Sequence, residues 1–453
     1  MTTETHVRTD IDADHGGHPR AWSDTRVVLV SLVLGATSAL ALTMLVFAGA
    51  TEAVVTGALL LGFSVGWSAL AVLSARRTHR PQRWARVPAI SMSVSGAALV
   101  VLAPGDSALR VLTWVWPLLM LVLVAWMFVQ ARRSLPSGAR HGLTPVFVVL
   151  AAVSVGALAS NVTSSQVADD HPAPGRTFAV GDHRLHIDCH GEGGPTVVLV
   201  SGLGEFSASW ARITDHVSDS TRVCAYDRAG QGWSDDVEEP QDGVTAAADL
   251  HSLLTAAGEK GPYVLVGHSI GGPYALTYAE KYPEDVAGMV LLDSSSPHQF
   301  SDMPAYPLQY ATMKRGLSLL PTLARIGLGP VIGPSSDLPR AGDVVEAVGS
   351  TVRAQRNARD ELSMLPRIFE QSTKLTTLGQ RPLVVLTASE NLGTEGWSTA
   401  QDRLAALSSD SVHRDVRSSH AGLVEDRSGA AASVDAIRVV VRSVNAGSPV
   451  STS

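Results

Sequence analysis

The middle of the chain contains the stretch Tyr263-Val264-Leu265-Val266-Gly267-His268-Ser269-Ile270-Gly271-Gly272. Its first four residues have the apolar pattern of a buried strand, and a helical pattern follows from Tyr274 to Tyr282. Between them stands Gly-x-Ser-x-Gly, the spacing of a sharp strand-to-helix turn. Its two glycines are needed because strand and helix come too close there for a Cβ atom. The pattern predicts that the Ser269 hydroxyl is held out at the end of a strand, next to a helix N-terminus.

The apolar residues before this stretch gather in five segments, each close to the roughly 20 residues that span a hydrocarbon core. They are apolar on every face, unlike the single stripe of a soluble amphipathic helix. Only 17% of the 453 residues are charged, and a net charge of −7 without a basic cluster gives no indication of nucleic acid binding. The predicted spans, within residues 26–160, are Val27–Phe47, Ala53–Leu73, Val87–Leu102, Val111–Val129 and Leu143–Ala159.

The arginines of the connecting loops alternate between the two ends of these spans. The second and fourth loops are rich in arginine, whereas Ala48–Glu52 has none and Ala103–Arg110 has one at its edge. The positive-inside rule then places the N-terminal tail, residues 1–25, in the cytoplasm, where we expect it to be disordered. With five spans, everything after Ala159 lies on the extracytoplasmic side of a multi-pass protein of the cell membrane. The arginines are Arg76, Arg77, Arg80, Arg83 and Arg86 in the second loop and Arg132, Arg133 and Arg140 in the fourth.

A second domain is expected from residue 177 to residue 445. Residues 161–176 have the Ser, Thr, Asp and Pro content of a linker. After it, short apolar strands alternate with helical patterns, which predicts an α/β domain with a mostly parallel sheet. Residues 446–453 are expected to be a disordered tail. The predicted strands are Thr177–Val180, His183–Cys189, Thr196–Val200, Arg222–Tyr226, Val264–Val266, Ala287–Leu292, Leu383–Thr387 and Ser411–Val416.

Two further motifs directly follow predicted strands. Ser201-Gly202-Leu203-Gly204 follows the third strand, and Asp227-Arg228-Ala229-Gly230-Gln231-Gly232-Trp233-Ser234 follows the fourth. With the Gly-x-Ser-x-Gly turn, the set resembles the α/β-hydrolase fold family, which carries an oxyanion loop and a structural D-x-x-G-x-G-x-S turn at these places. The resemblance implies a sheet of about eight mostly parallel strands. The long segment at about 296–380 has apolar residues at helical spacing, and we expect it to form a helical cap over the site.

A serine hydroxyl needs a base within hydrogen-bond reach, and the base needs an acceptor that orients it. In this family the chain order is Ser, acid, His. The nucleophile Ser269 is therefore paired with His420, in the loop after the last strand. For the acid we expect Asp293, directly after the sixth strand. Many members of the family carry the acid one strand later, in the loop that here reads Thr387–Asn391. That loop contains no Asp, but it contains Glu390, which is therefore the alternative acid.

The negative charge that develops on the substrate oxygen needs donors that are already in place. The backbone N–H groups of Ile270 and Leu203 are the expected pair. The commoner pattern of the family has histidine at the position of Ser201. The backbone donor of this loop can still form, but the side chain that supports the loop differs from the family pattern. Because the nucleophile is Ser269 and not aspartate, the resemblance implies acyl transfer to water, with neither a metal nor an organic cofactor.

These features predict a membrane-anchored serine hydrolase, with a carboxylic-ester hydrolase as the favoured class. It would act through an acyl-serine intermediate on a small-molecule ester or amide that could be lipidic, with membrane lipid as its surroundings. One alternative is a peptidase resembling the proline iminopeptidases. Another is a non-catalytic membrane receptor that keeps a hydrolase-like domain.

The chain has two cysteines, Cys189 and Cys224, which fall on strands that would be neighbours in this fold. They also fall on the side predicted to be outside the cytoplasm, where disulfides persist. We therefore expect a disulfide between them, and the alternative is two small buried apolar side chains.

Overall fold

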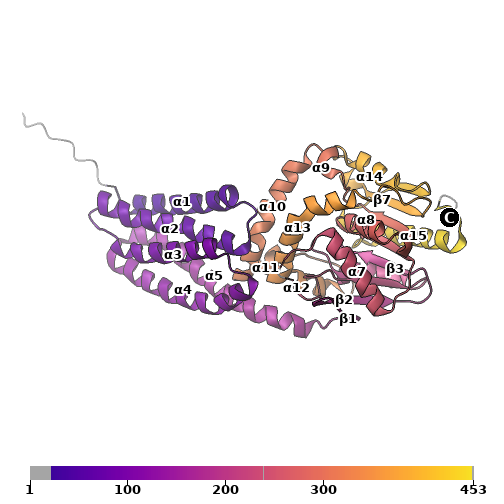
Figure 1. Cartoon of the computed structure of the whole chain (residues 1–453). Coiled ribbons are helices and arrows are strands. Elements are labelled where there is room, and N and C mark those ends of the chain that lie inside the picture. Colours follow the sequence, from indigo (N-terminus) through magenta and orange to yellow (C-terminus); the bar gives the residue numbers. More distant parts are fainter. Residues whose placement is uncertain (1–21, 238, 451–453) are drawn as a thin grey trace, which may run out of the picture.

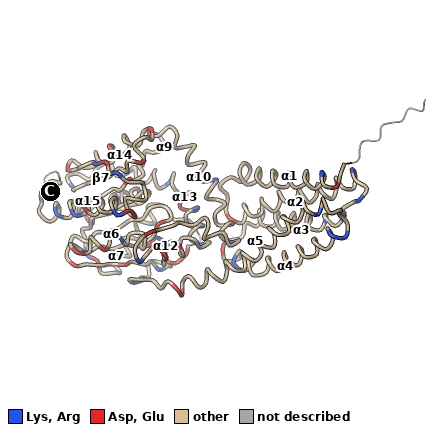
Figure 2. The backbone as a smooth tube through the Cα atoms, turned by 180° about the vertical axis from the view of Figure 1, so that it is seen from behind, with Lys and Arg blue, Asp and Glu red and all other residues tan. Residues whose placement is uncertain are grey.

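The computed structural model describes residues 22–237 and 239–450, so most of the predicted N-terminal tail, 1–25, lies outside the described residues. Five helices, each long and apolar enough to cross a membrane, pack side by side at one end of the molecule (Figure 1). Hardly any charged residue lies along the middle of this bundle, and Lys and Arg gather at its far end (Figure 2). The helices are α1 (Asp24–Ala41, continued by a π turn, Leu42–Val46), α2 (Glu52–Arg77), α3 (Arg86–Leu102), α4 (Asp106–Ser134) and α5 (Ser137–Asp170).

Helix α5 extends well beyond the predicted fifth span. The expected linker, 161–176, is helical as far as Asp170, and only residues 171–175 connect it to the first strand. The hydroxyls of Thr163 and Ser165 are satisfied within the helix: Thr163 Oγ1 donates to the carbonyl four residues earlier at 3.1 Å, and Ser165 Oγ to the carbonyl three residues earlier at 2.7 Å. No proline or glycine lies between Gly156 and Pro172. A rigid element therefore joins the bundle to the second domain.

Eight strands form one sheet in the order β1-β2-β4-β3-β5-β6-β7-β8. Strand β2 runs antiparallel to both of its neighbours, and all the other pairs are parallel. Every residue of β3, β4 and β5 is buried, as in sheets covered on both faces. The predicted fold class is confirmed. The strands are β1 (Arg176–Val180), β2 (His183–His190), β3 (Val197–Val200), β4 (Val223–Tyr226), β5 (Tyr263–His268), β6 (Val286–Leu292), β7 (Leu383–Ala388) and β8 (Ser411–Val416).

Helices cover both faces of this sheet. Successive side chains of a strand point to opposite faces, so Leu265 belongs to one apolar core and Val266 to the other. The core around Leu265 is completed by α7 (Gly243–Ala257), α8 (Gly271–Lys281) and α14 (Trp397–Ala405). The core around Val266 is completed by α6 (Ala211–Val217) and α15 (Arg427–Ala446).

The segment between β6 and β7 forms a helical layer, at the place where the sequence predicts a cap (296–380). It lies between the sheet and the five-helix bundle (Figure 1). We call this segment the cap. Its helices are α9 (Gln299–Asp302), α10 (Tyr306–Leu323), α11 (Gly329–Ile332), α12 (Gly342–Gly349) and α13 (Val352–Ser372).

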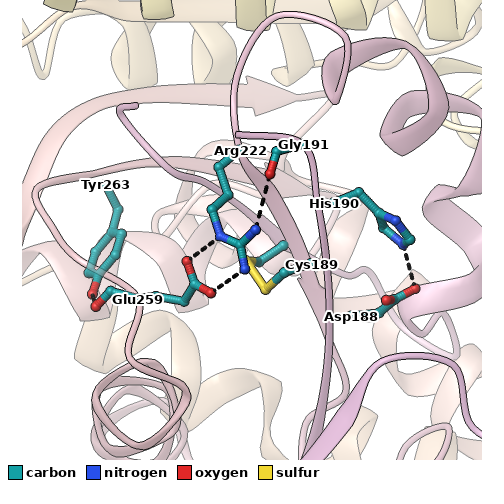
Figure 3. Close-up of a disulfide and its surroundings, with 8 residues drawn as sticks. Asp188, Cys189, His190, Gly191, Arg222, Glu259 and Tyr263 are labelled. Atoms are coloured by element: carbon teal, nitrogen blue, oxygen red, sulfur yellow. Dashed lines mark hydrogen bonds and ion pairs between the residues drawn. A yellow bond between two sulfur atoms is a disulfide. The ribbon is translucent and has the colours of Figure 1, made fainter. Parts of the chain in front are cut away.

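Cys189 of β2 and Cys224 of β4 stand directly opposite each other and are joined by a disulfide (Figure 3). Beside it, both carboxylate oxygens of Glu259 accept hydrogen bonds from Arg222, at 2.7 and 2.6 Å. The same guanidinium donates to the Gly191 carbonyl, at 3.1 Å. This edge of the domain is thus held by a covalent link and a two-pronged ion pair.

The described end of the chain differs from the expected disordered tail, 446–453. Helix α15 ends at Ala446, and the residues after it fold back onto the domain. Val450 is buried, and its N–H donates to the Asp410 carboxylate at 3.0 Å. The buried Val450 side chain and this hydrogen bond attach the described part of the segment to the domain.

Candidate active site

The turn at Ser269 has the geometry that its sequence predicts. Strand β5 ends at His268, Ser269 has a φ of 55°, and α8 starts at Gly271. A Cβ atom on Gly267 would lie 2.7 Å from the backbone of Gly272, and one on Gly271 would lie 2.0 Å from the Val200 carbonyl oxygen. Left-handed backbone at a non-glycine residue costs on the order of 1–3 kcal/mol, which the packed strand and helix must offset. Ser269 is partly exposed between buried neighbours.

His420 and Asp293 meet at the same edge of the sheet. His420 follows β8, and its ring nitrogen Nδ1 lies 2.6 Å from Asp293 Oδ2. Asp293 is fully buried and also accepts hydrogen bonds from the side chains of Asn391, at 2.6 Å, and Trp397, at 3.0 Å. Burial alone would raise the pKa of Asp293, but the hydrogen bond and charge of His420 and the other donors lower it below its usual value. The carboxylate is therefore ionised at neutral pH and holds the ring in one orientation.

Glu390, the alternative acid, contacts His420 elsewhere. Its carboxylate accepts the backbone N–H of His420, at 2.8 Å. The structure therefore brings Asp293 to the imidazole ring and Glu390 to the main chain of the same residue.

The loop Ser201–Gly204 lies against Ser269, the predicted nucleophile. A Cβ atom on Gly202 would be 3.1 Å from the Cβ of Ser269. Within the described part of the chain, the N–H groups of Leu203 and Ile270 donate no hydrogen bond. Ile270 is almost fully buried, and unpaired N–H groups are uncommon in buried backbone. These are the two donors that the sequence predicts for an oxyanion.

Arg228 binds the main chain of the loop Ser201–Gly204, a contact that the sequence did not predict. The buried guanidinium donates to the carbonyl of Ser201 at 2.7 Å and to that of Gly202 at 3.1 Å. Glu361 of the cap helix α13 pairs with Arg228 at 2.7 Å and also accepts the Tyr274 hydroxyl. Because the Gly202 carbonyl and the Leu203 N–H belong to one planar peptide unit, the hydrogen bond to that carbonyl also orients the N–H. The pairing of Arg228 with Glu361 could not be predicted, because the two residues are far apart in the sequence and no motif links them.

A second pair that sequence reasoning missed links the loop to the turn. Glu205 accepts the Gly202 N–H at 2.6 Å, and its other oxygen lies 2.8 Å from Nδ1 of His268. Nε2 of His268 lies 3.0 Å from the carbonyl oxygen of His420. Burial alone would lower the pKa of His268, but the charge of Glu205 outweighs it and raises that pKa. His268 therefore lies between Glu205 and the main chain of His420, and it connects the loop Ser201–Gly204 to the loop that carries His420.

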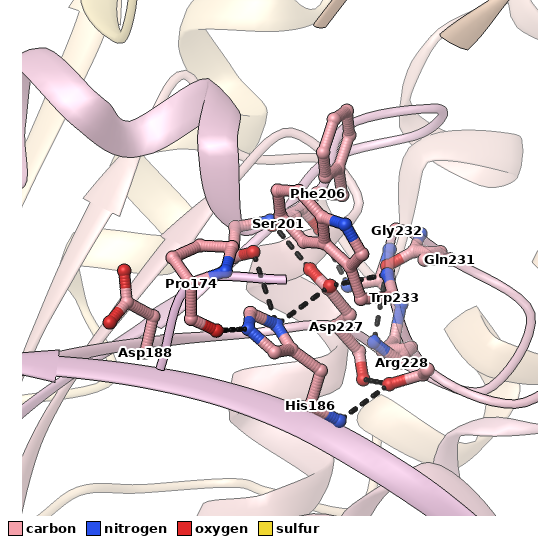
Figure 4. A network of polar contacts seen from close by, with 12 residues as sticks. Pro174, His186, Asp188, Ser201, Phe206, Asp227, Arg228, Gln231, Gly232 and Trp233 are labelled. Carbon is pink, nitrogen blue, oxygen red and sulfur yellow. Dashed lines mark hydrogen bonds and ion pairs between the residues drawn. The ribbon is translucent and has the colours of Figure 1, made fainter. Parts of the chain in front are cut away.

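Asp227, in the turn after β4, supports the site from a greater distance (Figure 4). Its carboxylate accepts the backbone N–H groups of Ser207 and Trp233 and faces Nδ1 of His186 at 2.9 Å. Nε2 of His186 faces the Pro174 carbonyl, just before β1. This is the structural role that the sequence predicts for the turn.

Within residues 22–237 and 239–450, one group of three side chains has the spacing of metal ligands. It consists of Cys189, Cys224 and Glu259. The two sulfur atoms are bonded to each other, so they are not thiolates, the form in which cysteine binds metal.

Comparison with known proteins gives the same fold. Residues 195–317 match the family model of the α/β hydrolase fold. An uncharacterized protein of Schizosaccharomyces pombe is 30% identical over 192 residues, which are 36% of this chain and 35% of that protein. An uncharacterized vacuolar membrane protein of Saccharomyces cerevisiae is 29% identical over 134 residues, 26% of this chain and 21% of that protein. The chain thus spans less than half of the length of these curated relatives.

Among solved structures, an esterase from Thermogutta terrifontis with malate bound is 22% identical to this chain. It aligns with a TM-score of 0.47, over 59% of this chain and 97% of the esterase. The matched segment contains β3 to β6 and the Ser269 turn, and the remaining strands complete the sheet on either side. The chain is therefore an α/β-hydrolase-fold protein that carries five apolar helices, fit for a membrane region, at its N-terminal end.

Proposed function

We propose that this protein is a membrane-anchored serine hydrolase that cleaves an ester or amide through an acyl-Ser269 intermediate. The observation that carries the proposal is the alignment of three groups at one edge of the sheet. Ser269 has left-handed backbone, and His420 Nδ1 lies 2.6 Å from the buried Asp293 carboxylate. Among the residues that the structure describes, the N–H groups of Leu203 and Ile270 donate no hydrogen bond.

In the first half-reaction, Nε2 of His420 takes the proton of the Ser269 hydroxyl as its oxygen attacks the substrate carbonyl carbon. The carbonyl oxygen becomes an oxyanion and accepts hydrogen bonds from the N–H groups of Leu203 and Ile270. Asp293 stabilises the imidazolium that forms. That imidazolium then protonates the leaving alcohol or amine as its bond to carbon breaks, which leaves the acyl group on Ser269.

In the second half-reaction, water replaces the leaving group. Neutral His420 takes a proton from the water molecule, and the hydroxide oxygen attacks the acyl carbon. The oxyanion forms again at the same two donors. When the bond to Ser269 breaks, His420 returns its proton to the serine oxygen, and the carboxylic acid leaves. No group other than these residues, the substrate and water takes part in the proton balance.

We place this site on the extracytoplasmic side of the cell membrane. Two observations support the placement. The arginine-rich loops, such as Arg76–Arg86, lie at the end of the bundle away from the hydrolase domain (Figure 2). The disulfide between Cys189 and Cys224 suits an oxidising compartment.

Labelling with a fluorophosphonate probe tests the proposed function. The full chain in detergent should react covalently, and Ser269→Ala should not react. Ser389→Ala is the matched control, since Ser389 is an exposed serine beside the same loops, and it should label as the wild type does. A wild type that stays unlabelled would favour the non-catalytic receptor, and a labelled protein that cleaves proline amides in preference to esters would favour the peptidase.

A further inference from the structure

The site faces the five-helix bundle. Ser269, Asp293 and His420 follow β5, β6 and β8, so they lie at the carboxyl ends of parallel strands. The cap begins at the same edge, and Figure 1 places it between this edge and the bundle. Helix α13 of the cap lies next to the oxyanion loop, because a Cβ atom on Gly204 would be 3.9 Å from that of Ala358. The reactive edge therefore points toward the apolar helices.

The cap packs on residues within the predicted membrane spans. The backbone of Gly156, inside the apolar helix α5, touches the turn after α10, since a Cβ atom on it would lie 2.3 Å from the Ile326 carbonyl oxygen. Ser160 donates to the Ala324 carbonyl at 3.0 Å. At the other side of the bundle, Thr56 of α2 bonds to Thr322 at 3.0 Å. This part of the cap thus lies level with the ends of helices long enough to span a bilayer.

Ion pairs fix the cap at this level. Arg325 contacts the carboxylates of Glu52, at the start of α2, and Asp106, at the start of α4. Asp106 also pairs with Arg356 of α13 at 2.9 Å. All four side chains are largely buried, and partly desolvated pairs of this kind hold elements in one arrangement. The cap cannot move away from the bundle without exposing these charges unpaired.

Most of the exposed large apolar side chains of the second domain belong to the cap. Among the described residues after β1 begins, four large apolar side chains are exposed: Leu308 (72%), Leu328 (41%), Val331 (79%) and Leu392 (37%). The first three belong to the cap segment that packs on the bundle. Leu392 follows β7, at the edge that carries the site. Among the described residues of this domain, no other large apolar side chain is exposed. Such clusters indicate an interaction surface.

The bilayer is the partner that fits this surface. The helix ends beside the cap also expose apolar side chains, among them Val46 and Leu102. In a membrane, lipid covers those helix ends, and the same layer continues over the adjoining cap. Apolar residues that project from an anchored domain at this level enter the boundary between head groups and acyl chains. No separate protein is needed to cover the cluster.

Building on the proposed function, we propose that Leu308, Leu328, Val331 and Leu392 lie in the interfacial layer of the bilayer, and that Ser269 cleaves an acyl lipid drawn from that layer. The substrate class is an amphiphile with a long acyl chain in ester or amide linkage. A site that faces the membrane receives such a molecule without its transfer through water, which would cost free energy for each methylene group.

The test uses the full chain reconstituted in phosphatidylcholine vesicles and two esters of one fluorogenic alcohol, a soluble butyrate and a membrane-resident oleate. The paired substitution Leu308→Ser/Val331→Ser removes the apolar side chains, and Leu308→Ile/Val331→Leu keeps them as the matched control. We expect the serine pair to lower oleate turnover by about tenfold and to leave butyrate turnover within about twofold of wild type. The control pair should match wild type on both esters.

Three results would overturn the inference while leaving the hydrolase assignment in place: equal losses on both esters, no loss on either, or a wild type that cleaves butyrate but not the vesicle-bound oleate. A loss that appears in cell membranes and not in pure phosphatidylcholine would assign the surface to a protein partner, which also contradicts it. If instead the wild type cleaves neither ester and does not react with a fluorophosphonate, the proposed function itself fails.

Discussion

Asp293 and Glu390 both reach His420, but they touch different atoms of it. Only Asp293 bonds to the imidazole, so Asp293→Asn should leave the ring in the wrong tautomer and lower turnover on the order of 10⁴-fold. Glu390 holds the backbone N–H, and Glu390→Gln keeps an acceptor there, so its loss should stay below about tenfold. Steady-state hydrolysis of a chromogenic ester measures both. Equal losses in the two variants would contradict the assignment.

Arg228 illustrates how a residue can act through the backbone of its neighbours. Arg228→Met alone leaves Glu361 as an uncompensated buried charge, so we expect a destabilised protein. Arg228→Met/Glu361→Gln removes both charges and should recover the thermal midpoint. Because the carbonyls of Ser201 and Gly202 then lose their donors, kcat should still fall on the order of 100-fold with little change in KM. Turnover that recovers together with stability would reduce Arg228 to a structural role.

His186 makes stability depend on pH. Burial alone would lower its pKa, but the hydrogen bond and charge of Asp227 and the carbonyl of Pro174 raise it above the usual value. A raised folded pKa contributes stability that is fully present below the unfolded pKa, about 6.5, and is lost as pH rises through the folded value. The Tm difference between wild type and His186→Gln should therefore be largest, on the order of a few degrees, below about pH 6.5 and shrink above it.

The control for this pH dependence is His190→Gln. His190 lies on the same strand, β2, but its side chain is half exposed. Exposed ion pairs contribute little, so its Tm should follow the wild-type curve at every pH. A His186→Gln curve parallel to wild type throughout would show that His186 does not titrate in the folded protein within the range measured.

At the scale of elements, the attachment of the cap to the bundle depends on Arg325. Its replacement by Met leaves the Glu52 carboxylate buried without a partner, whereas Asp106 keeps Arg356. Losing one member of a buried pair costs about 3–5 kcal/mol, so Tm in detergent should fall on the order of 10 °C. Glu52→Gln in the same chain should restore part of it. Arg110→Met is the control: it removes an exposed arginine from Asp106, which keeps Arg325 and Arg356, and it should change Tm by less than about 2 °C.

The elements themselves were largely predictable, and their junctions were not. Length and continuous apolar character located all five bundle helices. Short apolar runs between turn and helix patterns located the eight strands. The linker prediction was wrong over 161–170, since Ser and Thr favour loops only where no helix already satisfies their hydroxyls. The contact of Arg325 with Glu52 joins positions 273 apart, and such pairs leave no local pattern. In the sequence, Arg325 stands out only as a charged residue shortly after the apolar residues Leu320 and Leu323.

At the scale of the whole molecule, the residues of the site also fall into those that the sequence predicts and those that only the fold reveals. Ser269, Leu203 and Ile270 were predicted from motifs that follow strand ends, and His420 was predicted from the chain order of the family. Their catalytic roles stay predictions, but the structure places Ser269 directly after the carboxyl end of β5 and His420 in the loop after β8. The acid stayed open between two residues, since either side chain could reach the loop of His420 and only coordinates show which atom it contacts. Glu205 and Arg228 contact residues that are distant in the sequence, so their part in the site is recognised only once the fold is known.

Orientation in the membrane is the property of the whole molecule that remains a prediction, and single introduced cysteines can test it. The native cysteines are joined to each other and do not react with maleimide, so they can stay in place. His79, in the second loop, and Glu284, on the surface of the hydrolase domain away from the cap, are both exposed. In intact cells an impermeant maleimide should label Glu284→Cys and spare His79→Cys, because charged loops stay inside. After permeabilisation both should react. The reverse pattern would place the active site in the cytoplasm, and the disulfide would then need another explanation, because thiols there are kept reduced.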